Sequence, residues 1–102
     1  MEKSKRIKRE ENRLKKIFDG VDENKKMTVE GLIKRAAFMR ASLEDFEEDL
    51  DQNGFTEQFQ QGERQAPYDR KRPAADLYNT MNTGYQKIIK QLTDLLPDDK
   101  KE

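Results

Sequence analysis

The sequence contains no cysteine, histidine or tryptophan, and it has only three prolines and five glycines among its 102 residues. Without cysteine the chain cannot form a disulfide framework. Without histidine and cysteine it also lacks the usual proton carrier at neutral pH and the soft metal ligands. We therefore expect a protein that binds or assembles, with no enzymatic activity, no metal site and no cofactor.

Long apolar runs are missing as well. No segment approaches the roughly 20 consecutive apolar residues that a membrane-spanning helix needs. The segment Met1 to Arg9 is charged and is not followed by an apolar run, unlike a signal peptide. We therefore expect no membrane association and a cytoplasmic location.

Charged residues make up 41% of the chain and sum to zero net charge, but the two signs are segregated. Residues 1–16 are strongly basic, residues 44–51 are strongly acidic, and a second basic cluster lies at residues 70–72. Segregated charge of this kind suits self-association or a partner surface of both signs.

Apolar residues recur at spacings of three and four in two long segments, which predicts two amphipathic helices. The first should cover residues 24–53 and stop at Gly54, with Asp22 as a cap at its start. The second should cover residues 73–96, begin at Pro73 and stop at Pro97. A shorter basic helix is expected within residues 1–20, closed by Gly20 in the left-handed conformation.

The predicted fold class is all-α, with a short N-terminal helix followed by a long antiparallel helical hairpin. These elements form one domain over residues 1–97, and residues 98–102 form a tail. The connector at residues 55–72 is either a small β-hairpin, with strands at 55–59 and 64–68, or a loop. The N-terminal helix has few apolar residues, so we expect it to fray or project and Leu14→Ala to be better tolerated than truncation of a stripe residue.

A hairpin only two helices thick would leave apolar residues exposed, so the pattern predicts a homo-oligomer. The residues expected at the oligomer interface are Ile33, Met39, Leu43, Ile88 and Leu92.

The charge clusters allow more than one interpretation. The acidic run could hold a divalent cation, dock a basic partner or form a solvated face, and its carboxylates splay around a helix, which favours the solvated face. The basic residues could neutralise DNA phosphates or form ordinary helix ion pairs such as Arg6 with Glu10. The candidate DNA-binding residues are Lys3, Lys5, Arg6, Lys8, Arg9, Arg13, Lys15, Lys16, Arg70, Lys71 and Arg72.

Three segments carry a resemblance to a known family, namely Val29–Met39 (VEGLIKRAAFM), Leu77–Met81 (LYNTM) and Tyr85–Pro97 (YQKIIKQLTDLLP). They resemble small terminase subunits encoded in the packaging modules of tailed phages and prophages. The resemblance covers about Arg13 to Pro97. Larger small subunits carry a separate helix-turn-helix domain, for which the first helix is too short and too charged here.

The resemblance implies a non-catalytic DNA-packaging protein of a bacterial host cell. Such a protein assembles into a ring, binds double-stranded viral DNA and presents it to the large terminase subunit. In some such modules an HNH endonuclease is a further partner. The alternative interpretation is a phage-encoded helical adaptor or regulatory protein that binds only proteins.

Overall fold

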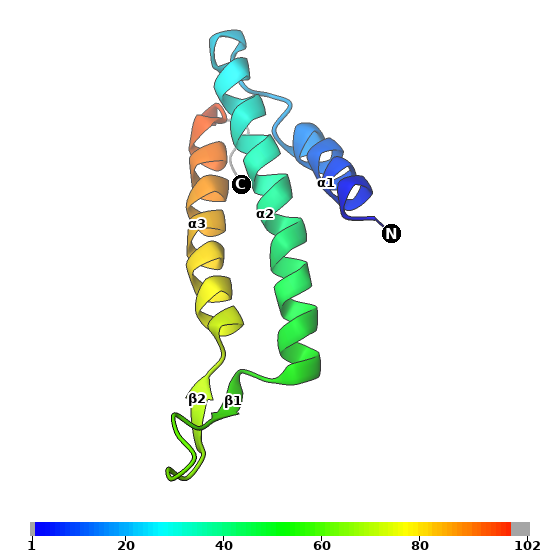
Figure 1. Cartoon of the computed structure of the whole chain (residues 1–102). Coiled ribbons are helices and arrows are strands. Elements are labelled where there is room, and N and C mark those ends of the chain that lie inside the picture. Colours follow the sequence, from blue (N-terminus) through cyan, green and yellow to red (C-terminus); the bar gives the residue numbers. More distant parts are fainter. Residues whose placement is uncertain (1, 99–102) are drawn as a thin grey trace.

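The computed structural model describes residues 2–98 and consists of three helices and a two-stranded sheet (Figure 1). The elements in chain order are helix α1 (Lys3–Ile17), the 3-10 turn η1 (Glu23–Lys25), helix α2 (Lys26–Asn53), strands β1 (Thr56–Phe59) and β2 (Tyr68–Lys71), and helix α3 (Pro73–Leu95). The predicted fold class is confirmed, because a short N-terminal helix precedes a long antiparallel helix pair with a small hairpin between its members.

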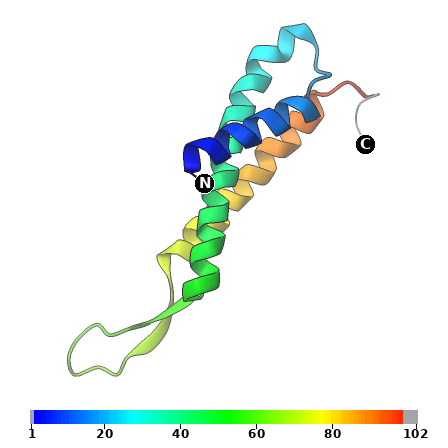
Figure 2. The same ribbon diagram turned by 90° about the vertical axis from the view of Figure 1, so that its right-hand side faces the viewer.

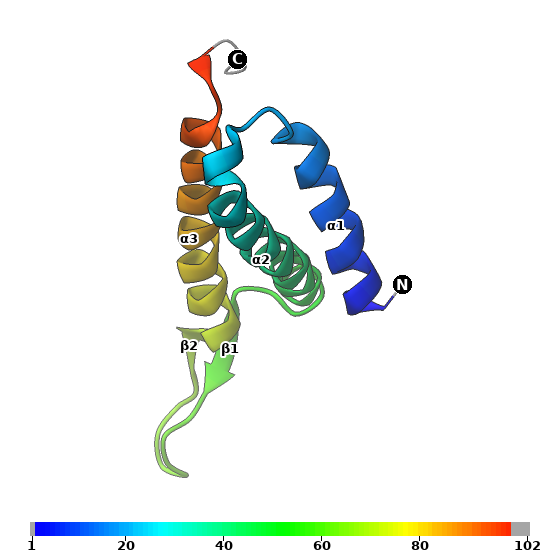
Figure 3. The same cartoon turned by 90° about the horizontal axis from the view of Figure 1, so that it is seen from above.

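The molecule is elongated, with principal extents of 64 × 28 × 21 Å and a Cα radius of gyration of 18.6 Å. A compact domain of this length would have a radius of about 13 Å. Helix α2 packs against both α1 and α3 (Figures 1 and 3). Figure 2 shows that α1 runs obliquely across the helix pair and that the β-hairpin extends beyond one end of it.

The core lies at the end of the helix pair that is far from the β-hairpin (Figure 1). It joins all three helices, and its buried members are Leu14, Phe18, Val29, Ile33, Ala36, Leu92 and Leu96. Leu14 and Phe18 lie one turn apart on α1 and therefore on the same face of it. The expectation that the N-terminal helix frays or projects is wrong, because these two residues dock α1 into the core.

The ends of α2 and α3 follow the predicted signals closely. Gly54 has a φ of 83°, and its N–H donates to the carbonyl oxygen of Leu50 at 2.8 Å, which ends α2. Pro73 occupies the first turn of α3, and the backbone becomes extended at Leu96, the residue before Pro97.

Two predicted end signals are wrong. Among residues 2–98, Gly54 is the only glycine with positive φ, so Gly20 does not close α1 in the left-handed conformation. Asp22 precedes the turn η1 rather than α2, and its side chain makes no capping hydrogen bond. The carbonyl oxygen of Asp22 instead accepts the N–H of Lys25 at 2.9 Å.

The connector forms an antiparallel hairpin in which Thr56 pairs with Lys71 and Phe59 with Tyr68. The second strand therefore lies at residues 68–71, not at the predicted 64–68. The register is set at the base of the hairpin, where the N–H of Arg72 donates to the carbonyl oxygen of Phe55 at 2.9 Å. Residues 60–67 form an exposed loop beyond the strands.

Candidate nucleic-acid interface

Two of the candidate DNA-binding cations hold α1 against the acidic run of α2. The guanidinium of Arg6 donates to Asp45 at 2.6 Å and to Glu44 at 3.3 Å. The ammonium of Lys3 lies 3.4 Å from the carboxylate of Asp45. The predicted pair of Arg6 with Glu10 is wrong, because Glu10 accepts two hydrogen bonds from Arg13 at 2.6 and 2.7 Å. Lys3 and Arg6 therefore contribute to the fold of α1 and not primarily to a nucleic-acid surface.

The pKa of Asp45 reflects this arrangement. Burial acts to raise the pKa, but the hydrogen bonds and positive charges of Arg6 and Lys3 outweigh it, so the pKa lies below the usual value of an aspartate. The carboxylate stays ionised at neutral pH and keeps both cations on the side of α1 that faces α2.

A second group of cations lies on exposed parts of α1. Lys5, Arg9 and Lys16 follow at spacings of four and seven, which places them along one helix face. Lys8 and Lys15 lie beside these three residues, and all five residues are exposed. The nearest carboxylates of Lys5 and Lys8 are 4.0 and 3.8 Å away, and the two side chains remain 71% and 65% exposed. We call Lys5, Lys8, Arg9, Lys15 and Lys16 the α1 strip.

The second basic cluster is bonded within the hairpin and its base. Arg70 donates to Glu57 at 2.7 Å and lies 3.7 Å from the ring centroid of Phe59. Lys71 lies 3.1 Å from Asp76. Arg72 donates to the carbonyl oxygen of Gly54 at 2.8 Å and to the carboxylate of Asp49 at 3.0 Å. Figure 1 shows that α1 and the hairpin lie beside different parts of α2, so the two basic groups do not form one patch.

The acidic run of α2 is largely occupied by groups of the same chain. Besides Glu44, Asp45 and Asp49, Glu47 accepts a hydrogen bond from the hydroxyl of Tyr78 at 2.8 Å. This hydrogen bond raises the pKa of Tyr78. Within residues 2–98, no group of three or more acidic side chains converges in a way that could hold a metal ion. The sequence shows where these charges lie, but their partners lie on other elements of the fold.

Three of the five residues expected at an oligomer interface are buried within one chain, namely Ile33, Leu43 and Leu92. This corrects the expectation for them, since a core residue offers no surface to a second copy. Met39 and Ile88 are partly exposed. The large apolar residues that are exposed were not among the candidates, and they are Ile17, Met27, Phe38, Phe55, Tyr68 and Leu77.

Phe38 is the exposed apolar residue that the sequence signals most directly. It lies nine positions after Val29, or about 900° around the helix, so it points away from the buried stripe to which Val29 belongs. Its ring contacts the ammonium of Lys3 at 4.9 Å from the ring centroid, but 49% of its surface is exposed.

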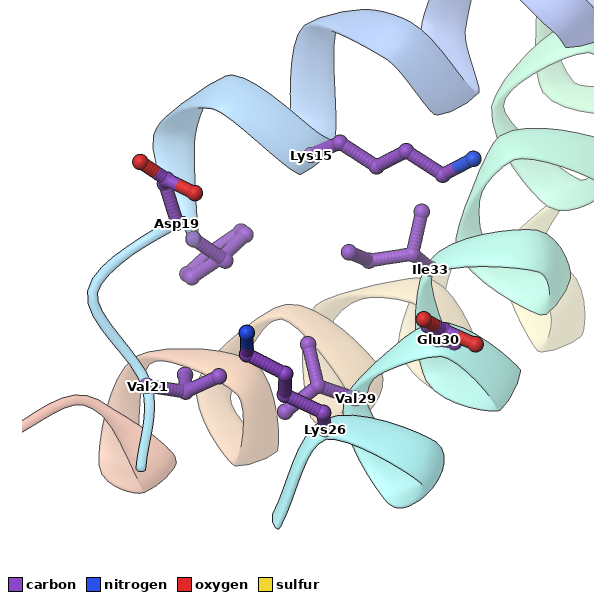
Figure 4. Close-up of a pocket in the computed structure, with 8 residues that line it drawn as sticks. Lys15, Asp19, Val21, Lys26, Val29, Glu30 and Ile33 are labelled. Carbon is purple, nitrogen blue, oxygen red and sulfur yellow. The ribbon is translucent and has the colours of Figure 1, made fainter. Parts of the chain in front are cut away.

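A small hollow of about 220 Å³ lies where the end of α1 meets the start of α2. Figure 4 shows an apolar floor that includes Val21, Val29 and Ile33, with Lys15, Lys26, Asp19 and Glu30 around it. Binding pockets for small molecules usually measure about 300–1,000 Å³. The hollow is therefore the open edge of the core, with charges of both signs at its rim.

No protein-family model matches the chain, and no curated protein or solved structure matches it. Within residues 2–98 no helix combines the length and apolar character needed to cross a membrane. A functional assignment therefore depends on the resemblance of the α2 and α3 segments and on the surfaces described above.

Proposed function

We propose that the protein is a non-catalytic DNA-packaging protein of the small terminase subunit class. In this proposal it forms an oligomer, binds double-stranded viral DNA and recruits the large terminase subunit in the cytoplasm of a bacterial host. An HNH endonuclease is a further partner where the packaging module encodes one. The ring implied by the resemblance is the proposed arrangement of the subunits.

The α1 strip is the observation that carries the DNA-binding part of the proposal. Because α1 is docked by Leu14 and Phe18, the strip is presented on a fixed helix and not on a fraying segment. From Lys5 to Lys16 it extends about 17 Å at 1.5 Å per residue. This length matches about five base pairs of B-form DNA at 3.4 Å per pair.

The strip contains lysine and arginine but no group arranged to read base edges. We therefore propose weak sequence preference for each subunit, with affinity gained from several copies on one duplex. Lys3, Arg6 and Arg72 are reassigned to structural roles in this proposal, because their bonds are within the chain.

The test is a triple variant that replaces three positive charges of the strip with neutral side chains, Lys5→Gln, Arg9→Gln and Lys16→Gln. Its affinity for duplexes of different sequence should fall alike, and the slope of log affinity against log salt should become shallower by up to about 2.7, or 0.9 for each lost phosphate contact. Fluorescence anisotropy over a range of salt concentrations measures both quantities.

The matched control removes the same number of charges from the hairpin loop and α3, by Arg64→Gln, Lys87→Gln and Lys90→Gln. Its binding should stay close to that of the parent. Equal losses in the two triple variants would contradict a localised DNA site on α1.

One observation favours the alternative function, a helical adaptor that binds only proteins. At least six of the eleven candidate DNA-binding cations form ion pairs of 3.4 Å or less within the described residues, so fewer cations remain for phosphate than the sequence suggests. They are Lys3, Arg6, Arg13, Arg70, Lys71 and Arg72. An adaptor should show no retention of DNA at low or moderate salt while still binding the large subunit in a pull-down assay.

A further inference from the structure

An apolar groove runs along the exposed face of α2. It consists of two adjoining hollows of about 380 and 560 Å³ that share Phe38 and Met81. Met39 and Phe46 add to its apolar surface, and Lys3 of α1 lies at its rim with its ammonium 4.9 Å from the ring centroid of Phe38. Among residues 2–98, nothing in the chain covers Phe38 fully, and about half of its surface is exposed.

The residues along this groove are arranged symmetrically about Ser42, which is only 6% exposed and lies at the floor of the groove, so that a contact is made by the side chains that protrude around it. Phe38 and Phe46 lie four residues on either side of it, and Arg35 and Asp49 lie seven residues on either side. These positions share one face of the helix because their spacings are three, four and multiples of a helical turn. Two antiparallel copies of the face, centred on Ser42, would therefore bring each Phe38 to Phe46 and each Arg35 to Asp49 of the other copy.

The charges of α2 select the same direction. Before Ser42 the helix has four cations, Lys26, Lys34, Arg35 and Arg40, against one acid, Glu30. After Ser42 it has no cation and the six acids of residues 44–51. On the face that carries Phe38 and Phe46, antiparallel copies place Arg35 of one copy against Asp49 of the other, whereas parallel copies would place like charges together.

The guanidinium of Arg35 is available for such a contact. It forms no ion pair with any residue in the described part of the chain and is exposed. Asp49 already accepts hydrogen bonds from Arg72 and Asn53. A carboxylate has about four acceptor positions, so Asp49 can also accept from a second arginine.

We propose that this face of α2 binds the same face of a second copy, with the two helices antiparallel and Ser42 on the two-fold axis. The contact is isologous and closes on itself, so it yields a dimer and does not by itself generate a ring. It involves Phe38, Phe46, Arg35 and Asp49 and leaves the α1 strip uninvolved. The proposal therefore does not depend on whether the protein binds DNA.

The register is tested by cross-linking, which is clean because the chain has no native cysteine. Gly31 and Asn53 lie eleven residues on either side of Ser42, so the proposed dimer brings one close to the other. Gly31 tolerates a side chain, since nothing lies within 4 Å of a Cβ built there, and Asn53 is exposed at the helix end.

An equimolar mixture of Gly31→Cys and Asn53→Cys proteins should give a covalent dimer with a short bis-maleimide, and each protein alone should not. In the proposed arrangement two copies of the same cysteine are about 33 Å apart along the helices. Cross-linking of Gly31→Cys with itself would indicate parallel helices and overturn the proposal, as would failure of the mixture to cross-link.

The second test is sedimentation velocity on the uncross-linked protein. At micromolar concentration the parent should sediment as a dimer of about 24 kDa, twice the chain mass of 12.1 kDa, or as a larger assembly built from such dimers, and not as a monomer. Phe38→Glu should raise the dissociation constant at least tenfold. Ile17→Glu is the matched control, because Ile17 is equally exposed at 50% but lies on α1, and this variant should dimerise like the parent.

Circular dichroism of both variants separates loss of the dimer from loss of the helices. A parent that stays at 12 kDa up to millimolar concentration would overturn the proposal. So would a folded Phe38→Glu protein that dimerises as tightly as the parent. The DNA-binding titrations test the α1 strip, and sedimentation and cross-linking test the contact between α2 helices. Failure of one proposal is therefore recognised independently of the other.

Discussion

Truncation of Leu14 to alanine should destabilise the protein strongly, although Leu14 lies outside both long apolar stripes. Its side chain is 1% exposed and belongs to the core cluster that joins α1 to α2 and α3. Substitutions of leucine by alanine at such positions cost about 2–5 kcal/mol, through lost transfer free energy and the cavity that remains. A domain of this size has a total stability of about 5–15 kcal/mol, so the loss would be a large fraction of it.

The appropriate assay is urea unfolding followed by far-UV circular dichroism, with the free energy of unfolding extrapolated to water. Leu92→Ala, at a fully buried position on α3, supplies the benchmark and should cost a similar amount. Ile17→Ala, on the exposed side of α1, should change the stability by less than about 1 kcal/mol. If Leu14→Ala resembled Ile17→Ala and not Leu92→Ala, α1 would not be docked in solution and the core that joins the three helices would be incorrect.

Three further predictions concern single positions. The pKa of Asp45 is lowered in the folded state, so its contribution to stability should be complete above about pH 5 and should be lost as the pH falls through the folded pKa, below about 3.9. The difference in unfolding free energy between the parent and Asp45→Asn, measured by urea unfolding at several pH values, should therefore shrink at low pH. A difference that stayed constant would contradict the ion pairs of Asp45 with Arg6 and Lys3. Gly54→Ala should destabilise the protein by about 1–3 kcal/mol in thermal or urea unfolding, because a φ of 83° with a ψ of 176° is accessible essentially to glycine alone. Gly62→Ala is the control and should be nearly neutral, because Gly62 does not have a positive φ and nothing lies within 4 Å of a Cβ built there. Gly84→Ala should be neutral or stabilising by up to about 1 kcal/mol, since alanine favours the helix and the only close group is the flexible methyl end of Met39 at 3.1 Å; a marked loss of stability would show that Met39 cannot move.

The regular part of the fold could be predicted from the sequence because its signals are local. The periodic apolar residues and the stops at Gly54 and Pro97 define α2 and α3 to within two residues. The docking of α1 could not be predicted in this way. It depends on Leu14 and Phe18 and on the pairing of Arg6 with residues 38 and 39 positions away, and local spacing carries no information about such partners.

The same limit applies to the candidate surfaces. The sequence identified the basic clusters at residues 1–16 and 70–72, but it could not show that Arg72 is bonded to Asp49 or Arg70 to Glu57, since these pairs form only when the hairpin closes. It also placed Ile33, Leu43 and Leu92 on the correct helix faces without indicating which neighbour covers them. In a helix packed on two sides, periodicity identifies the buried face and leaves its partner open.

The anchoring of the β-hairpin makes its tip a site for engineering. Arg72 joins the two ends of the connector through Gly54 and Phe55, so the helices are held together at the base of the hairpin, whatever the length of its loop. Residues 60–67 are exposed and contribute nothing to the core. The entropic cost of closing a loop increases by only about 0.6 kcal/mol for each doubling of the loop length. A peptide tag or a fluorophore-bearing insert in this loop should therefore be accommodated without unfolding of the helices. Such an insert would report on assemblies of this protein from a point well away from both the α1 strip and the groove of α2.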